Sequence, residues 1–397
     1  MRPLLVSVLP RPPHPTRDGL AIRNHALLSA LAEDFRVRAF TLRDRDRDYA
    51  PEPPSGVELE EVPQVRRGRR RAAALAGSLL VAGAYSERLY RSAALSRRVA
   101  DAVRGEPSAW VVAHSYHVAP AALASGRPVW IDFHNLDSEI WRRVAETARS
   151  AGERLFARIQ APRVAELEGR LARAASAVSC VSDRDADALR RIGARAAPRV
   201  VPNGVDLSRY EMRPSQPPGE TVFFVGDLSW PPNAEAVRWL RDRVWPELRR
   251  RRPGASGEIL GRGAPPDLTA DAPDGFRLLG EGGDTRPHWA RAAVTVVPLL
   301  AGGGTRLKIV EAAACGVPVV STSVGAEGLE LHGGIDILLR DDPAGFAEAV
   351  ATLLADPAAA RRQAEAARTR VETTYDWRAI GRGFAEAVRA AASASRG

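Results

Sequence analysis

The stretch that most constrains this chain is residues 298–320, PLLAGGGTRLKIVEAAACGVPVV. It follows the apolar run 293–297, and together they predict a strand, a glycine loop, a helix and a second strand. Strands that alternate with helices are typical of parallel sheets, so this segment favours a doubly wound α/β lobe. We expect the helix to begin near Thr305 and to end at Gly316, which would act as its C-terminal capping glycine.

The glycine loop and the first turn of this helix have the composition of a phosphate site. Glycines 302–304 carry no Cβ, so their backbone N–H groups can approach a ligand closely. Arg306 and Lys308 lie at the positive end of the helix dipole, where acidic side chains are normally favoured, and Lys308 is the only lysine in the chain. A bound anion would remove this conflict. The alternative is a solvated helix in which Lys308 pairs with Glu311 one turn later.

Charge is distributed unevenly along the chain. The first 200 residues contain 33 Arg and 23 acidic residues, for a net charge of +10, whereas the remainder contains 24 Lys and Arg and 25 acidic residues, for a net charge of −1. A basic first half favours an acidic acceptor, an anionic membrane surface or nucleic acid. Nucleic acid is the least favoured of the three, because the arginines alternate with acids and no nucleic-acid-binding motif is present.

Several segments bear on the cellular location. The basic cluster 66–71 precedes the uncharged apolar stretch 72–85, a pattern typical of a membrane-surface segment but equally compatible with a helix packed on the lobe. That stretch is too short to span a bilayer, and the apolar run 4–9 is too short for a signal peptide. The two cysteines, in apolar contexts, are expected to be buried free thiols. We therefore expect a cytoplasmic protein that can attach to the inner face of the membrane.

The alternation of strands and helices occurs twice. The first series opens with the strand 4–9 and a helix over residues 20–33, and the second opens after the proline-rich segment 212–220 with the strand 221–225. This pattern predicts an α/β protein with two Rossmann-like doubly wound lobes. The expected divisions are a first lobe at 1–208, a second lobe at 209–372 and a C-terminal helix at 373–397 that crosses back to the first lobe.

Two predicted strands of the first lobe end in histidine-bearing loops. These loops are AHSYH at 113–117 and DFHN at 132–135. Open α/β sheets bind ligands beyond the carboxyl ends of their strands. His114, His117 and His134 are therefore candidates for the active site, although an isolated histidine is more often structural.

The sequence does not favour a metal site. Residues 43–48, RDRDRD, imitate the Asp-x-Asp motif of metal-dependent sugar transferases. The arginine at every second position can pair with these carboxylates, so a solvated loop is favoured. Asp183, Asp185 and Asp187 fit the first turn of a helix, where acidic side chains are favoured.

The two lobes, with a phosphate-binding helix in the second, resemble the GT-B fold, in which two Rossmann-like lobes face a central cleft. More specifically, the sequence resembles glycosyltransferase family 4, the retaining nucleotide-sugar glycosyltransferases. The segments that carry the resemblance are VVPNGVDL (200–207), FVGDLSWPPN (224–233), RLLGEGGD (277–284) and GGGTRLKIVEAAACGVPVVST (302–322). The resemblance covers nearly the whole chain and is most specific in the second lobe.

The resemblance implies that the lobe at 1–208 binds the acceptor and that the lobe at 209–372 binds the nucleotide sugar. It also implies roles for individual residues. Glu311 matches the second Glu of the family's Glu–seven residues–Glu motif, which holds the donor ribose, whereas Gly303 stands at the position of the first Glu. The Arg and Lys that many members carry after Val225 are also absent, and Asp227 lies there instead. The implied catalytic residue is His134. The implied donor-binding residues are Gly19, Gly302, Gly303, Gly304, Thr305, Arg306, Lys308 and Glu311, and the acceptor-binding candidates are Arg17, His114, His117 and Asn135.

The implied activity is a front-face transfer, with retention, of a sugar from a nucleoside-diphosphate sugar to a saccharide, a lipid-linked saccharide or a natural product. No metal or other cofactor is expected. The expected partners are the nucleotide-sugar donor, a saccharide, lipid-phosphate or small-molecule acceptor, and an anionic membrane surface, but no nucleic acid. Two alternatives remain: a GT-B sugar-nucleotide 2-epimerase, and a catalytically silent sugar-nucleotide-binding partner protein, which the missing first Glu would permit.

Overall fold

The computed structural model describes residues 2–14, 19–43, 52–64, 68–81, 83–148, 150–213, 219–270, 272–301 and 306–394. The chain divides into unit 1, formed by Met1–Pro202 and Arg378–Gly397, and unit 2, formed by Asn203–Trp377. The first boundary thus falls after Pro202 rather than after residue 208, and the chain returns to unit 1 at Arg378 rather than at residue 373.

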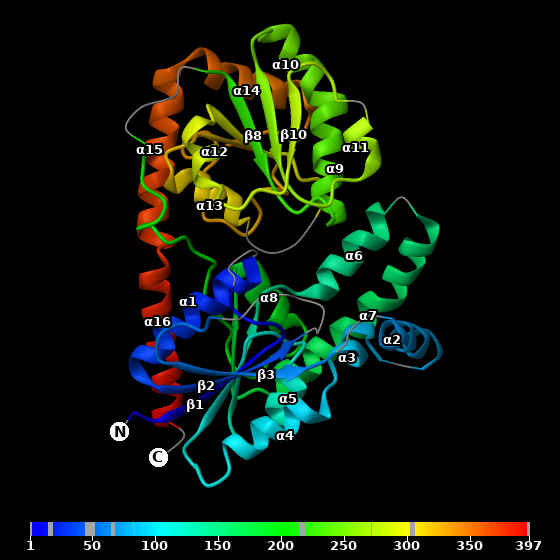
Figure 1. Ribbon diagram of the computed structural model, residues 1–397, viewed down its shortest axis with the longest axis vertical. Helices are drawn as coiled ribbons and strands as arrows, with labels where there is room; N and C mark the ends of the chain where they lie inside the picture. Colours follow the sequence, from blue (N-terminus) through cyan, green and yellow to red (C-terminus); the bar gives the residue numbers. More distant parts are fainter. Residues whose placement is uncertain are drawn as a thin grey trace. The chain divides into compact units, whose positions relative to one another are not determined.

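Unit 1 is built on a parallel seven-stranded sheet with the order β3-β2-β1-β4-β5-β6-β7 (Figure 1). All six residues of β1 are buried, as expected for a central strand of a sheet that is covered on both faces. The strands are β1 (Leu4–Leu9), β2 (Arg36–Arg43), β3 (Val57–Pro63), β4 (Trp110–Ala113), β5 (Val129–Phe133), β6 (Ala177–Cys180) and β7 (Arg199–Val200).

Helices cover both faces of this sheet. Helices α1 and α16 lie on one face, and α4 and α5 lie on the other (Figure 1). The helices of unit 1 are α1 (Gly19–Asp34), α2 (Arg69–Leu80), α3 (Tyr85–Tyr90), α4 (Ala93–Ala102), α5 (Ala119–Leu123), α6 (Asp137–Thr147), α7 (Ala151–Ala174), α8 (Asp183–Arg191) and α16 (Trp377–Ala394).

The C-terminal helix α16 is fastened to unit 1 by close packing. A Cβ placed on Gly381 would lie only 2.8 Å from the Cβ of Ala30 on α1. The ring of Phe384 meets the ring of Trp130 on β5 edge to face, with 5.4 Å between the ring centroids. A small residue and an aromatic anchor therefore both contribute to the position of helix α16.

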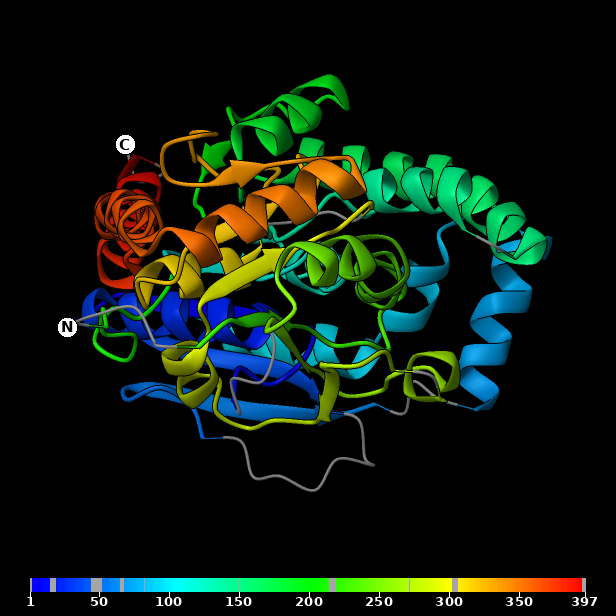
Figure 2. The ribbon, with the colours of Figure 1, turned by 90° about the horizontal axis from the view of Figure 1, so that it is seen from above.

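Unit 2 contains a parallel six-stranded sheet with the order β10-β9-β8-β11-β12-β13. Its strands are β8 (Thr221–Val225), β9 (Ser256–Leu260), β10 (Phe276–Gly280), β11 (Val294–Val297), β12 (Val319–Ser321) and β13 (Leu338–Leu339). Its helices are α9 (Pro231–Trp239), the π-helical turn η1 (Leu240–Val244), α10 (Trp245–Arg251), α11 (Pro266–Ala270), α12 (Arg286–Arg291), α13 (Leu307–Ala314), α14 (Pro343–Ala355) and α15 (Pro357–Thr374). Figure 2 shows these elements from above.

The structure confirms the elements expected around residues 298–320. Strand β11 is followed by helix α13 and then by strand β12, and Gly316, with φ of +70°, ends the helix. Only a glycine adopts this backbone conformation readily. The glycine loop 302–305, Arg17 and residues 44–50 lie outside the described residues, as do Arg66 and Arg67 of the basic cluster.

Candidate active site

In unit 2, the ammonium of Lys308 lies against the end of strand β8. Its Nζ atom is 3.1 Å from Oδ1 of Asn233 and 4.1 Å from the centroid of the Phe224 ring. Asn233 is held in turn, because its Nδ2 donates to the backbone oxygen of Asp227 at 2.9 Å. The amide therefore presents its oxygen to the ammonium, while the ring face stabilises the positive charge.

Gly226 makes this close approach possible. A Cβ at this position would lie 2.9 Å from Nζ of Lys308 and 2.8 Å from Nδ2 of Asn233. Any side chain here would push both polar groups away. The residue directly after β8 must therefore be a glycine if Lys308 is to keep this position.

Lys308 does not form the ion pair expected of a solvated helix. Within the described residues, no carboxylate forms an ion pair with Lys308, and this includes Glu311. Burial and, to a smaller extent, the neighbouring Arg306 lower the pKa of Lys308 to about 7, although Glu311 opposes both effects. Arg306 is itself buried at the N-cap position of α13. A buried ammonium without a carboxylate partner, at the positive end of a helix, is costly unless an anion joins it.

Glu311 lies one turn along α13 and contacts a different group. Its carboxylate is hydrogen-bonded to the hydroxyl of Tyr210, and burial raises the pKa of Glu311 to about 7. The Tyr210 hydroxyl also contacts Thr285, and burial raises the pKa of Tyr210 well above its usual value. Because Lys308 and Glu311 have separate partners, the two side chains can bind different parts of one ligand.

The sequence analysis missed four residues of this cluster. Phe224, Gly226 and Asn233 lie within the segment 224–233, which was noted only for its resemblance, and Tyr210 precedes the linker. The resemblance had instead drawn attention to Asp227. Its carboxylate pairs with Arg262 at 2.7 Å and accepts hydrogen bonds from Ser229, so it orders the loop after β8.

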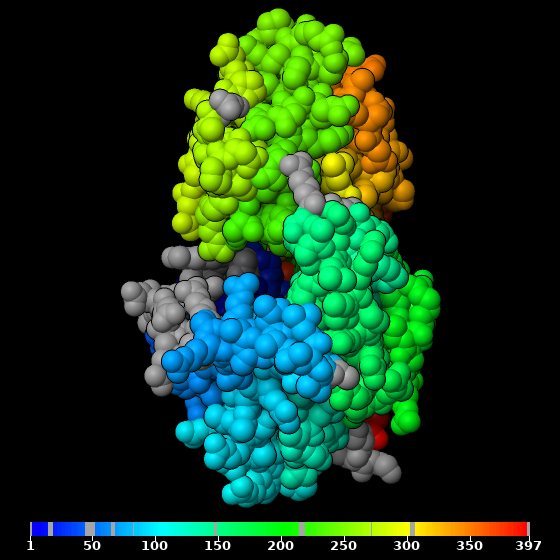
Figure 3. Space-filling model, turned by 90° about the vertical axis from the view of Figure 1, so that its right-hand side faces the viewer, coloured from blue at the N-terminus to red at the C-terminus, as the bar shows by residue number. Residues whose placement is uncertain are grey.

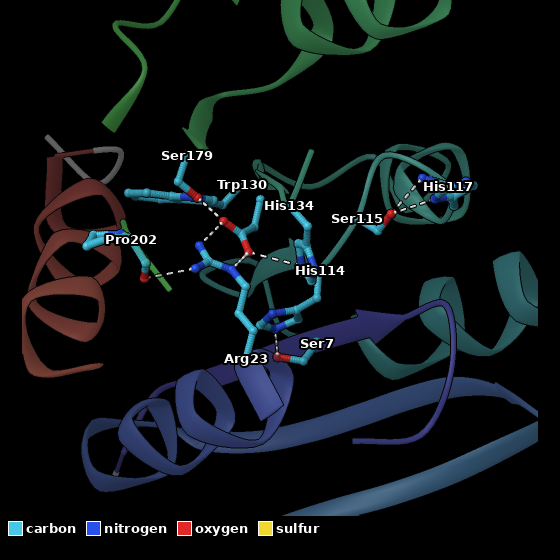
Figure 4. Close-up of polar contacts among 10 residues, drawn as sticks. Ser7, Arg23, His114, Ser115, His117, Trp130, His134, Ser179 and Pro202 are labelled. Carbon is cyan, nitrogen blue, oxygen red and sulfur yellow. Dashed lines mark hydrogen bonds and ion pairs between the residues drawn. The ribbon is translucent and has the colours of Figure 1, made fainter. Parts of the chain in front are cut away.

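In unit 1, a buried carboxylate organises the carboxyl ends of the central strands. Asp132 on β5 accepts hydrogen bonds from Nε and Nη2 of Arg23, both at 2.8 Å, and from the Ser179 hydroxyl at 2.6 Å (Figure 4). Trp130 donates to Ser179, and Arg23 also donates to the backbone oxygen of Pro202. Burial alone would raise the pKa of Asp132, but Arg23 outweighs it and holds the pKa well below its usual value.

His134 lies beside this carboxylate. Its Nε2 atom is 3.2 Å from Oδ2 of Asp132, and only 11% of its side chain is exposed. Burial lowers the pKa of His134, while Asp132 opposes the shift. The imidazole is therefore neutral near pH 7, and the anchored carboxylate restricts its orientation. This is the environment of the residue that the resemblance implies to be catalytic.

The other candidates of unit 1 are in different surroundings. His114 is completely buried, with Nε2 3.3 Å from the Ser7 hydroxyl, and burial lowers its pKa to about 3. His117 lies apart in Figure 4, with Nδ1 2.8 Å from the Ser115 hydroxyl. Asn135 is half-buried and Gly19 is exposed at the start of α1. The structure thus groups His114 and His134 around Asp132, but not His117.

Three further observations concern the chain as a whole. Among the residues described, no group of three or more His, Cys, Asp or Glu is arranged to hold a metal ion. No helix within the described ranges is long and apolar enough to cross a membrane. Cys180 and Cys315 are buried free thiols, as the sequence predicts.

Comparison with known structures identifies the class of fold. The chain is similar to sucrose-phosphate synthase from Thermosynechococcus elongatus, with a TM-score of 0.75, 18% identity and coverage of 99% of this chain and 100% of that one. It is also similar to Anabaena Alr3699/HepE in complex with UDP-glucose, with a TM-score of 0.66, 15% identity and coverage of 97% and 99%. The two parallel sheets and these neighbours define a GT-B fold.

Comparison of sequences identifies the family. Residues 18–204 match the model of the glycosyl transferase 4-like domain, and residues 219–356 match that of glycosyl transferases group 1. Glycogen synthase from Mycobacterium tuberculosis is 33% identical over 214 residues, which are 50% of this chain and 49% of that protein. D-inositol 3-phosphate glycosyltransferase 1 from Catenulispora acidiphila is 38% identical over 117 residues, 26% of this chain and 27% of that protein. The chain belongs to glycosyltransferase family 4, although the match to glycogen synthase spans only about half of that relative's length.

Proposed function

We propose that this chain is a retaining glycosyltransferase that moves a sugar from a nucleoside-diphosphate sugar to a hydroxyl group of an acceptor. The observation that carries the proposal is the pair of buried cations at the start of α13, where Lys308 has no carboxylate partner among the described residues. A diphosphate at this helix N-terminus would pair with Lys308, and the charge of Arg306 and the helix dipole would favour it. The solved complex of HepE with UDP-glucose agrees with this class of donor.

The same cations would act in the chemical step. When the bond between the sugar's anomeric carbon and the diphosphate breaks, negative charge develops on the leaving oxygen. Lys308 and Arg306 would stabilise this charge, and one such group is worth about 3 kcal/mol in a preorganised site. The acceptor hydroxyl attacks the same face, and the leaving phosphate takes its proton. No metal is needed for this charge, so we expect a chelator such as EDTA to leave the rate unchanged.

We assign supporting roles to Glu311 and His134. Glu311 would hold the ribose hydroxyls of the donor, the role that the family resemblance implies, and its hydrogen bond with Tyr210 would orient the carboxylate. His134 would orient the sugar. Its neutral imidazole can donate a hydrogen bond without repelling the positive charge that develops on the sugar ring. With Gly303 in place of the family's first Glu, the backbone of residues 302–305 would contact the donor sugar.

The experiment that tests the proposal combines binding and turnover. A thermal-shift panel of UDP-, GDP-, ADP- and dTDP-sugars should identify a donor that stabilises the protein by about 2.7 kcal/mol at a hundredfold excess over Kd. With that donor, Lys308→Ala should lower kcat/KM by about a hundredfold or more while the circular dichroism spectrum stays the same. Arg340→Ala, which removes an exposed cation of the same unit, is the matched control. An unchanged kcat/KM in Lys308→Ala would rule out the assignment.

Two other outcomes would point to the alternative functions. Conversion of the nucleotide sugar in the absence of any acceptor would favour a sugar-nucleotide 2-epimerase. Stabilisation by a nucleotide sugar without any transfer or conversion would favour a catalytically silent partner protein. Both alternatives share the phosphate site, so only the turnover assays separate them from a transferase.

We also propose that unit 1 attaches to an anionic membrane surface through helix α2. Leu75, Leu79 and Leu80 are exposed on this helix, Leu80 to 83%, and Arg69 and Arg71 are exposed in its first turn. Figures 2 and 3 show α2, in blue, on the outside of unit 1. Exposed leucines beside arginines fit the boundary between acyl chains and anionic headgroups, whereas the basic flank would repel a second copy of this chain.

Vesicle sedimentation tests this attachment. The protein should bind vesicles that contain phosphatidylglycerol more tightly than neutral vesicles, and high salt should weaken the binding. Leu79→Glu with Leu80→Glu should abolish it. Ile335→Glu, at a site in unit 2 that is 64% exposed, should not. Binding that high salt leaves unchanged, or self-association in place of vesicle binding, would contradict the proposal.

A further inference from the structure

A groove with a volume of about 590 Å³ lies on the paired helices α6 and α7 of unit 1. These helices are drawn in teal beside α2 in Figure 3. Neither the donor site nor the Asp132 cluster includes any residue of the groove. It is lined by Arg142, Ala145, Glu146, Arg154, Arg158 and Ala161.

The groove is open because small residues line it. Ala145 and Ala161 have no side-chain atoms beyond Cβ, so they leave space that a larger residue would fill. Pro162 lies inside α7 directly after Ala161. It lacks the N–H group that would bond to the backbone oxygen of Arg158, and so this turn of α7 is not optimised for helix stability.

Arginines outnumber carboxylates among the residues that line the groove. Three arginines line it, but only one carboxylate, that of Glu146, does so. Arg154 is fixed in place because it donates to the backbone oxygen of Ala148 at 2.7 Å, and Arg142 pairs with Glu139, which is not part of the lining. Arg158 is exposed and forms no ion pair with the described residues. The guanidinium group of Arg158 is therefore available to an anion that enters the groove.

We propose that this groove binds a phosphate ester, and that this ester is part of the acceptor. The guanidinium group matches a phosphate with two parallel hydrogen bonds, which favours arginine over lysine for this ligand. The volume lies within the usual range for small-molecule sites, about 300–1,000 Å³, and accommodates a phosphorylated monosaccharide. The phosphate binding stands on the groove alone, whereas its connection with an acceptor rests on the proposed function.

The test is a binding titration in which Lys308, one of the two cations of the unit 2 site, has been removed. In a Lys308→Ala background, glucose 1-phosphate should bind, and glucose at the same concentration should not. Arg158→Gln should weaken the binding about tenfold, and Arg142→Gln with Arg158→Gln should abolish it. Ala161→Leu should also abolish it, because the new side chain fills the groove without changing its charge. Arg97→Gln on α4 removes an exposed arginine of the same unit and should have no effect.

Vesicles provide the second arm of the test. If vesicles that contain phosphatidic acid bind through Arg142 and Arg158 but glucose 1-phosphate does not, the phosphate ester belongs to a lipid headgroup, and the groove is still its site. Equal affinity for glucose 1-phosphate and glucose would overturn the proposal. The same loss in Arg97→Gln as in Arg158→Gln would also overturn it, because it would show a response to net charge only. Donor-induced stabilisation, measured in parallel on Arg158→Gln with Lys308 intact, reports on the donor site separately.

Discussion

At the scale of single residues, Lys308 is the side chain whose surroundings are most specific. Its ammonium lies over the ring of Phe224, close enough to Arg306 for the charge of that residue to lower the pKa of Lys308. The ammonium can occupy this position because Gly226 has no side chain. Burial opposes its charge, whereas the ring face and the Asn233 oxygen favour it. Because of this balance, the ammonium of Lys308 should remain protonated when a phosphate is bound and should lose its proton more easily when no anion is present.

The donor affinity should therefore depend on pH. The pKa of Lys308 is lowered to about 7 in the free protein, and a bound diphosphate would raise it because it stabilises the charged form. Affinity for the nucleoside-diphosphate sugar, measured as Kd by calorimetry, should fall as the pH rises from 7 towards 8.5, because Lys308 then loses its charge. Lys308→Arg keeps its charge throughout this range. An equal decline in that variant would show that another group is responsible.

Sequence reasoning succeeded at this scale only where the signal was local. The start of α13 could be recognised from neighbouring glycines and cations, and Gly316 from its place after the apolar helix. The partners of these residues could not be found in this way. Asn233 is 75 positions from Lys308, and Arg23 is 109 positions from Asp132, so these contacts exist only after both sheets have formed.

At the scale of elements, strand–loop–helix alternation predicted the parallel sheets because both faces of each sheet are covered. The pattern could not show that most side chains of α2 are exposed. Its alanines and leucines suit a packed helix equally well, but only Ala74 and Ser78 are buried. Whether an apolar helix meets a protein surface is decided by the neighbouring elements, and no local sequence signal records it.

Two glycines of helix α16, Gly381 and Gly383, allow a test of how closely this helix packs on α1. A Cβ at Gly381 would collide with Ala30, whereas a Cβ at Gly383 would meet nothing within 4 Å. Gly381→Ala should destabilise unit 1 by about 1–3 kcal/mol through overpacking. Gly383→Ala should be neutral or stabilise by up to about 1 kcal/mol, because alanine favours the helix. Urea denaturation of the two variants measures the difference, and similar midpoints would show that α16 does not pack closely on α1.

At the scale of the whole molecule, the chain contains two units with separate hydrophobic cores. One core is centred on strands β8 and β11 of unit 2, and the other on β1 and β4 of unit 1. The two cations of the proposed diphosphate site, Arg306 and Lys308, both lie in unit 2. The chain leaves unit 1 after Pro202 and returns to it at Arg378, so unit 1 needs both ends of the chain to be complete.

This organisation predicts how ligands and substitutions affect unfolding. Calorimetry should resolve two transitions, because each unit has its own core. A nucleoside-diphosphate sugar at a hundredfold excess over Kd should stabilise unit 2 by about 2.7 kcal/mol and so raise the temperature of its transition. Lys308→Ala should remove that shift. Gly381→Ala should lower only the other transition, because its contact with Ala30 lies in unit 1. If Gly381→Ala instead lowers the transition that the nucleotide sugar raises, the two units do not unfold separately. The loss of donor-induced stabilisation in Lys308→Ala could then not be assigned to unit 2 by calorimetry.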